Sequence, residues 1–122
     1  MCLKLGLIYL ACPYSHKDSK VRNERVHSVN KAAGHLLKNG YLVYSPISMS
    51  HNIALDCNLE SDYISWEPLD TEMLTRCDSL VILLLEGWTE SRGVRAEYDL
   101  ATSLGKPIYM MTNYPEYYLE LL

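Results

Sequence analysis

Residues 80–101 read LVILLLEGWTESRGVRAEYDLA, and this stretch decides the fold. The apolar run from Leu80 to Leu85 is typical of a strand buried on both faces, and a short polar turn separates it from a helix. That helix places Gly93 and Glu97 one turn apart on the same face. Free N–H groups at a helix start favour an anion, so the turn predicts a ligand-binding site beside the Glu97 carboxylate. The alternative interpretation of Glu97 is an acidic residue that stabilises the start of the helix.

The remainder of the chain also alternates strands with helices. Apolar runs and turn residues predict strands at 5–11, 41–44, 80–85 and 107–111, helices at 19–39, 65–77 and 93–104, and a short terminal helix at 114–122. Pro68 falls in the first turn of the helix at 65–77, which precedes the third strand. Residues 46–61 predict a long irregular loop. The pattern indicates one domain, residues 1–122, with a three-layer flavodoxin-like (Rossmann-like) α/β fold. We expect a parallel sheet of four to five strands in the order 2-1-3-4, with helices on both faces.

Composition limits the classes of function. The net charge is −4 and no basic run is present, which argues against nucleic-acid binding. No apolar segment approaches the ~20 residues that span a bilayer, and the N-terminus lacks the pattern of a signal peptide, so we expect a cytoplasmic protein with no membrane partner. The four cysteines form no C-x-x-C pair and no His lies at metal spacing, so neither a metal site nor a disulfide framework is expected.

Ligands of parallel α/β sheets bind at the carboxyl ends of the strands. The loops at 12–18, 45–53 and 86–93 all leave such ends, so they should converge on one rim. They supply most of the candidate binding residues, which are Cys12, Pro13, Tyr14, Ser15, His16, His51, Ser91 and Gly93, while Tyr9 comes from the first strand. Each also has an ordinary structural role open to it, such as a buried thiol for Cys12 or a helix cap for Ser91.

Glu97 and Asp70 form a candidate pair of catalytic carboxylates. Retaining glycosyl chemistry needs one carboxylate as a nucleophile at the anomeric carbon and a second group that manages the leaving-group proton. A departing nucleobase suits this scheme, because a protonated carboxyl can donate to a ring nitrogen. Spacing alone does not place Asp70 at the rim, and a surface or capping role is its alternative.

Several segments carry a resemblance to a known family. These are IYLACPYSH at 8–16, SMSH at 48–51, Asp70 followed by Asp78, and GVRAE at 93–97. Over about residues 5–112 the chain resembles the nucleoside 2-deoxyribosyltransferase superfamily. It is most similar to a family of short bacterial and phage proteins of unknown function placed near that superfamily.

The resemblance implies roles for particular residues. Glu97 falls at the nucleophile, Asp70 at an aspartate that engages the base, and Ser91 at a phosphate-binding serine of the branch that hydrolyses nucleoside monophosphates. Residues 12–15 match a loop that closes over the sugar. It further implies a nucleoside or nucleotide as the small-molecule substrate and no cofactor. A homo-oligomer, dimer or tetramer, is also implied, in which C-terminal residues such as Asn113 complete a neighbouring site.

The sequence departs from the family pattern at three places. Arg95 lies between Gly93 and Glu97, Cys12-Pro13 stands where the hydrolase branch has Gly-Ser, and Ser15 stands where it has an arginine. The predicted function is cleavage or transfer at an N-glycosidic bond of a (deoxy)nucleoside or its 5′-monophosphate. The alternatives are a non-catalytic nucleotide-binding or sensing module on the same fold, and an oligomeric structural protein with a vestigial site.

Overall fold

The computed structural model describes residues 5–59 and 63–122 and contains a five-stranded sheet in the order β2-β1-β3-β4-β5. The four parallel strands are β1 (Leu7–Ala11), β2 (Leu42–Tyr44), β3 (Ser79–Leu83) and β4 (Ile108–Met111). The last strand, β5 (Leu119–Leu121), runs antiparallel to β4. The structure confirms the flavodoxin-like α/β fold and the predicted order of the first four strands.

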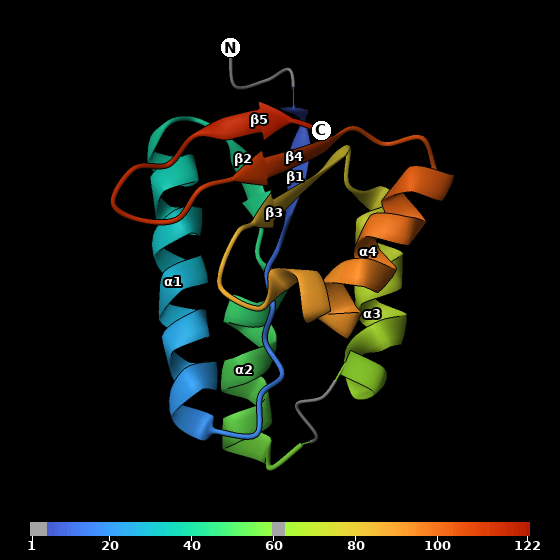
Figure 1. The fold of residues 1–122 in the computed structure, drawn as a ribbon. Coiled ribbons are helices and arrows are strands. Elements are labelled where there is room, and N and C mark those ends of the chain that lie inside the picture. The colour runs from blue at the N-terminus through green and yellow to red at the C-terminus, as the bar shows by residue number, and fades with distance from the viewer. Residues whose placement is uncertain (1–4, 60–62) are drawn as a thin grey trace.

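The helices form the outer layers of this fold. They are α1 (Ser19–Lys38), α2 (Pro46–Cys57), α3 (Tyr63–Arg76) and α4 (Arg92–Ser103), with the short 3₁₀ helix η2 (Trp88–Glu90) before α4. Figure 1 shows α1 on one side of the sheet and α3 with α4 on the other. Helix α2 lies beyond the carboxyl ends of the strands, where it contacts α1 and β1. None of the helices in the described part of the chain is long and apolar enough to cross a bilayer.

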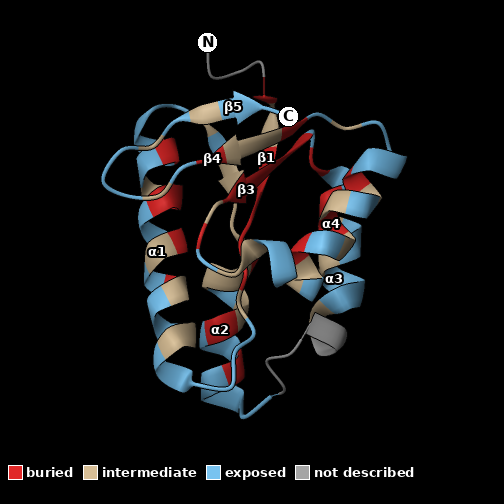
Figure 2. Ribbon diagram, viewed as in Figure 1, coloured by how far each residue is buried: buried red, intermediate tan, exposed pale blue. Residues whose placement is uncertain are grey.

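Two apolar clusters, one on each face of the sheet, make up the core. In β1, Ile8 and Leu10 pack toward α1, whereas Tyr9 and Ala11 pack toward α3 and α4. All five residues of β3 are buried, and its apolar residues alternate between the two clusters. Figure 2 shows this burial on the strands and on the inward faces of the helices. Strands covered on both faces explain the continuous apolar runs of the sequence.

The prediction of an irregular loop at 46–61 is wrong, because residues 46–57 form helix α2. Pro46 occupies the start of α2, where its fixed φ favours helix, and the helix ends at Asn58 in the left-handed conformation. The apolar pattern did not predict this helix, because α2 buries His51 while it exposes Met49, Ile53 and Leu55. An apolar stripe therefore does not mark its buried face.

The prediction of a terminal helix at 114–122 is also wrong. The chain turns after β4 and returns as β5, with Met111 opposite Leu119 and Tyr109 opposite Leu121. Thr112 fixes the turn, since its hydroxyl donates to the Glu116 carbonyl and accepts from the Tyr118 amide. The open edge of β4 offers unpaired backbone groups, and pairing with them outweighs the local preference of the tail.

Smaller differences concern element boundaries. Strand β1 begins at Leu7, β3 ends at Leu83, and α3 begins at Tyr63, which puts Pro68 in its second turn instead of its first. Cys2 and residues 60 and 61, the end of the predicted loop, lie outside the described residues. These shifts leave the predicted topology intact.

Candidate functional site

A cavity of about 890 Å³ opens at the carboxyl ends of the strands. Three segments converge on it, from the loop after β1, the first turns of α2 and the loop after β3, as their places at strand ends predicted. Side chains of α1, α3 and α4 complete the wall, and these include Val21, Arg25, Trp66, Asp70 and Glu97. Asp70 is therefore at the rim, a position that its spacing in the sequence did not determine.

Glu97 faces the sheet from the second turn of α4 and is buried. The Tyr9 hydroxyl, at the centre of β1, donates a hydrogen bond of 2.5 Å to Glu97 Oε2. Tyr9 itself is fully buried and lies behind Glu97, so it contacts the carboxylate and does not line the cavity. The bond engages one carboxylate oxygen and leaves Oε1 free of it.

Burial controls the protonation of both carboxyl groups. It raises the pKa of Glu97 to about 8, with a further increase from the nearby Asp70 charge, although the Tyr9 hydrogen bond works in the opposite direction. Burial alone raises the pKa of the half-buried Asp70 to about 6. Perturbed carboxyl groups that face one cavity are typical of functional sites.

The loop after β1 contributes Cys12, Tyr14 and Ser15 to the cavity wall, whereas Pro13 is buried in the interior. The Tyr14 hydroxyl is 2.7 Å from Nδ1 of His51, and the two rings meet edge to face. His51 lies behind Tyr14 in α2 and does not line the cavity, and burial lowers its pKa. His51 thus holds Tyr14 in place. Burial also raises the pKa of the Cys12 thiol, which keeps that thiol protonated.

The start of α4 forms another part of the wall. Ser91 is the N-cap of α4, and its Oγ accepts a hydrogen bond of 3.2 Å from the Val94 amide. Ser91, Arg92 and Gly93 all line the cavity. Unpaired N–H groups of a first helical turn suit an anionic or hydroxyl group of a ligand.

Arg25 is a cavity residue that the sequence analysis missed. Its guanidinium group donates to the Ser15 carbonyl at 3.0 Å and to the Glu86 carbonyl at 3.1 Å. It thereby joins the loops after β1 and β3, whose strands are neighbours in the sheet. Gly87 has a φ of 91°, and a Cβ atom there would lie 2.7 Å from Arg25 Nη2. Only the tertiary pairing of β1 with β3 brings these groups together.

The two tryptophans lie in different places. Trp66 lines the main cavity, whereas Trp88 and Arg95 line a smaller pocket of about 360 Å³ against β4. Asp78, part of the resemblance motif, lies at the opposite end of the sheet, where its carboxylate accepts from the Leu7 amide at 2.7 Å. Among the residues that the structure describes, no cluster of three His, Cys, Asp or Glu side chains has the geometry of a metal site.

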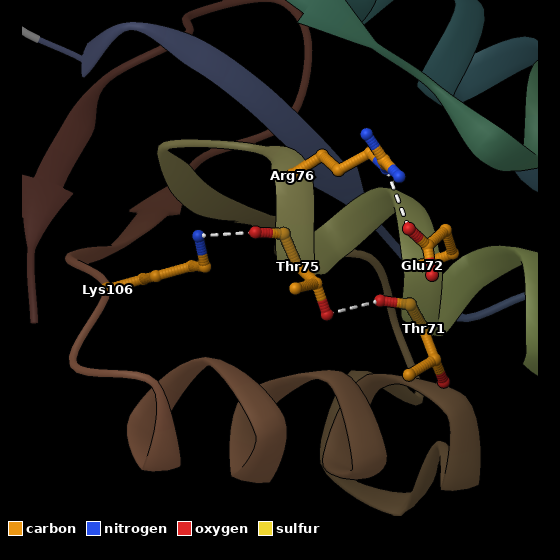
Figure 3. Close-up of polar contacts among 5 residues, drawn as sticks. All are labelled: Thr71, Glu72, Thr75, Arg76 and Lys106. Carbon is orange, nitrogen blue, oxygen red and sulfur yellow. Dashed lines mark hydrogen bonds and ion pairs between the residues drawn. The ribbon is translucent and has the colours of Figure 1, made fainter.

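Lys106 anchors α3, the helix that carries Asp70. Figure 3 shows its ammonium group, in the segment after α4, directed at the Thr75 carbonyl, and the bond measures 3.0 Å. The same group donates to the Cys77 carbonyl. These bonds satisfy carbonyl groups at the carboxyl end of α3, where a positive charge is favourable.

The fold and the cavity define a three-layer α/β protein with paired carboxyl groups at the carboxyl ends of its strands. The chain belongs to the family described as domain of unknown function DUF1937, whose model matches residues 6–113. That match covers the whole sheet up to β4 and every residue of the cavity. No curated protein matches the sequence.

Proposed function

We propose that this protein cleaves or transfers at the N-glycosidic bond of a (deoxy)nucleoside or nucleoside 5′-monophosphate. The observation that carries the proposal is the pair of carboxyl groups, Glu97 and Asp70, which face one cavity from neighbouring helices. The motifs that carry the resemblance to nucleoside 2-deoxyribosyltransferases include the same two residues. Family membership alone gives no activity, so the argument depends on this site.

The titration of the pair supports this chemistry. With pKa values of about 6 for Asp70 and about 8 for Glu97, the two groups share one proton near neutral pH. Glycosyl transfer needs that state, with one carboxyl ionised as the nucleophile and the other protonated as the acid. At these values the proton lies mainly on Glu97, and the reactive arrangement is the less populated form with the proton on Asp70. The Tyr9 hydrogen bond favours that form because it stabilises ionised Glu97.

In the proposed reaction, Glu97 Oε1 attacks C1′ of the sugar while the bond from C1′ to the base nitrogen breaks. The bonding electrons pass to the base, which takes up the proton of Asp70. The product is a glycosyl ester on Glu97. Water or a second base then attacks C1′, and the ester bond breaks with its electrons returning to the Glu97 carboxylate. The attacking water or base passes its proton to Asp70. Hydrolysis and transfer differ only in this acceptor.

The part of the cavity wall at the start of α4 suits the 5′ end of the substrate. Ser91 and the Gly93 backbone lie at the start of α4, and Arg25 and Arg92 add positive charge to the same cavity. A 5′-hydroxyl or 5′-phosphate can be held there while the anomeric carbon faces Glu97. Trp66 lies one helical turn from Asp70 and offers an aromatic surface for the base.

A non-catalytic nucleotide sensor is the second candidate. Its supporting observation is the raised pKa of Glu97, because a protonated carboxyl at neutral pH is a neutral hydrogen-bond donor for a ribose hydroxyl. The sensor would bind nucleotides without releasing the base.

The deciding experiment incubates the protein with each deoxynucleoside, ribonucleoside and 5′-monophosphate, with and without an acceptor base, and measures free base by chromatography. We expect base release by the wild type and a loss of at least about 100-fold in Glu97→Gln, because the amide is not a nucleophile. Glu90→Gln is the matched control, since Glu90 lines the same cavity but is exposed. Binding without base release from any substrate would favour the sensor.

A further inference from the structure

Tyr44 ends β2 and presents an unexplained polar group. Its side chain is half-buried, but the hydroxyl is buried and has no hydrogen-bond partner among the residues that the structure describes. Nearly all buried polar groups of native proteins have a partner, and leaving one unpaired is costly. A nearby acceptor that reaches this hydroxyl by rotation of its own side chain would therefore supply the missing hydrogen bond.

The position of Tyr44 repeats that of Tyr9. The two residues are partners in the β1–β2 register, their ring centroids are 5.8 Å apart, and both pack on the face covered by α3 and α4. Tyr9 donates to Glu97 of α4. Two tyrosines of neighbouring strands thus face the two neighbouring helices that carry the carboxyl groups.

Asp70 is the acceptor that matches Tyr44. Its charge acts on the phenol, since burial first and Asp70 next raise the pKa of Tyr44. Burial is the sole cause of the raised pKa of Asp70, so no hydrogen bond from the described residues offsets it. Asp70 is half-buried on the cavity wall, which leaves its carboxylate room to rotate.

We propose that Tyr44 is a positioning residue for Asp70, and that its hydroxyl donates a hydrogen bond to the ionised Asp70 carboxylate. The site then consists of two tyrosine–carboxylate pairs, Tyr9 with Glu97 and Tyr44 with Asp70. The catalytic consequence rests on the proposed function. Once Asp70 has passed its proton to the departing base, Tyr44 stabilises and orients the carboxylate that remains.

Titration of Asp70 tests the pairing without any substrate. Protein labelled with ¹³Cγ-aspartate is followed by NMR from pH 4 to 9, and the Asp70 signal is assigned by its loss in Asp70→Asn. A hydrogen bond to the charged form lowers a pKa, so Tyr44→Phe should raise the Asp70 pKa by about 1. Besides Tyr44, the groups of the described residues whose pKa is raised by Asp70 are Glu97 on α4 and Tyr9 on β1, and both are unchanged in this variant.

Tyr109→Phe is the matched control. Tyr109 lies in β4 of the same sheet, half-buried against the opposite face, and its substitution should leave the Asp70 titration unchanged. An Asp70 pKa that stays the same or falls in Tyr44→Phe would overturn the proposal. So would an equal rise in Tyr109→Phe, because the effect would then be a general loosening of the sheet.

A second substitution preserves the hydroxyl and strengthens it as a donor. 3-Fluorotyrosine at position 44 has a more acidic phenol, so it should lower the Asp70 pKa, and an unchanged value would contradict the pairing. The base-release assay on Tyr44→Phe should show a lower kcat with KM nearly unchanged. If no substrate releases base from the wild type, the proposed function fails while the titration still decides the role of Tyr44.

Discussion

Glu97 has an environment that opposes its own ionisation. It is buried in the α4–sheet interface and the neighbouring charge is that of another acid, Asp70, and these two effects outweigh the hydrogen bond from Tyr9, which favours the ionised form. An apolar side chain would fill such a place more favourably. Groups that reduce stability in this way are common at functional sites, where activity and stability conflict.

Because Glu97 reduces the stability of the folded protein, we predict that Glu97→Gln is more stable than the wild type. Burial raises the folded-state pKa of Glu97 from 4.5 to about 8, so the folded protein retains a proton that the unfolded chain loses above pH 4.5. Stability from this group is complete below pH 4.5 and is lost as the pH rises toward 8. The amide resembles the protonated acid, so the variant should be more stable than wild type at pH 8 by on the order of 2 kcal/mol.

Urea unfolding at pH 5 and pH 8 measures this effect. The advantage of Glu97→Gln should be small at pH 5 and large at pH 8, and the exposed Glu90→Gln should show little change at either pH. A variant that is less stable than wild type at pH 8 would mean that Glu97 is a structural residue.

Gly6 predicts a second effect at the scale of one residue. Its φ is 61°, and an added Cβ atom would lie 2.3 Å from Asp78 Oδ2, the acceptor of the Leu7 amide. Gly6→Ala should therefore lower the free energy of unfolding by about 2–4 kcal/mol, from backbone strain and the lost hydrogen bond.

Gly34→Ala is the control for Gly6→Ala. Gly34 lies inside α1 with no atom within 4 Å of an added Cβ, so alanine should stabilise the protein by roughly 0.5–1 kcal/mol. Chemical denaturation measures both variants. Equal effects of the two substitutions would contradict the structure around Gly6.

At the scale of an element, the position of Asp70 depends on how α3 is held. Helix α3 packs on α4, and Lys106 donates to carbonyl groups at its carboxyl end (Figure 3). Lys106→Met should cost about 1–2 kcal/mol of stability, because charge-assisted hydrogen bonds to two carbonyls are lost. It should also weaken base release, since Asp70 loses its fixed position.

Arg76→Met is the matched control on the same helix. Arg76 forms a 2.7 Å ion pair with Glu72, but both side chains are largely exposed, so its loss should change stability by no more than about 0.5 kcal/mol. Thermal unfolding compares the two variants. A larger effect of Arg76→Met than of Lys106→Met would show that Lys106 does not anchor α3.

At the scale of the whole molecule, stability should follow the strand order. Strand β3 lies at the centre of the sheet with every residue buried, whereas β5 lies at an edge and is mostly exposed. Native-state hydrogen exchange should protect β1 and β3 amides most and β5 amides least, because edge strands open locally. Protection of β5 equal to that of β3 would mean that the terminal hairpin is part of the central folding unit.

The sequence was sufficient to predict the main features of the fold. Apolar runs mark strands buried on two faces, their alternation with helices implies a parallel sheet, and the loops after the strands then converge at one rim. These patterns are local, and the right-handed crossovers that follow from the chirality of the chain convert them into a sheet topology. For the same reason Glu97, early in a helix after the third strand, was a candidate before its surroundings were known.

Only the tertiary structure placed the residues around Glu97 and its cavity. Tyr9 meets Glu97 across 88 positions of sequence, Arg25 joins two loops through the β1–β3 pairing, and Asp70 reaches the rim because α3 packs on α4. The tail became a strand because β4 left an open edge. Such contacts depend on which elements are neighbours in space, and burial, which sets the protonation of both carboxyl groups, exists only after the chain has folded.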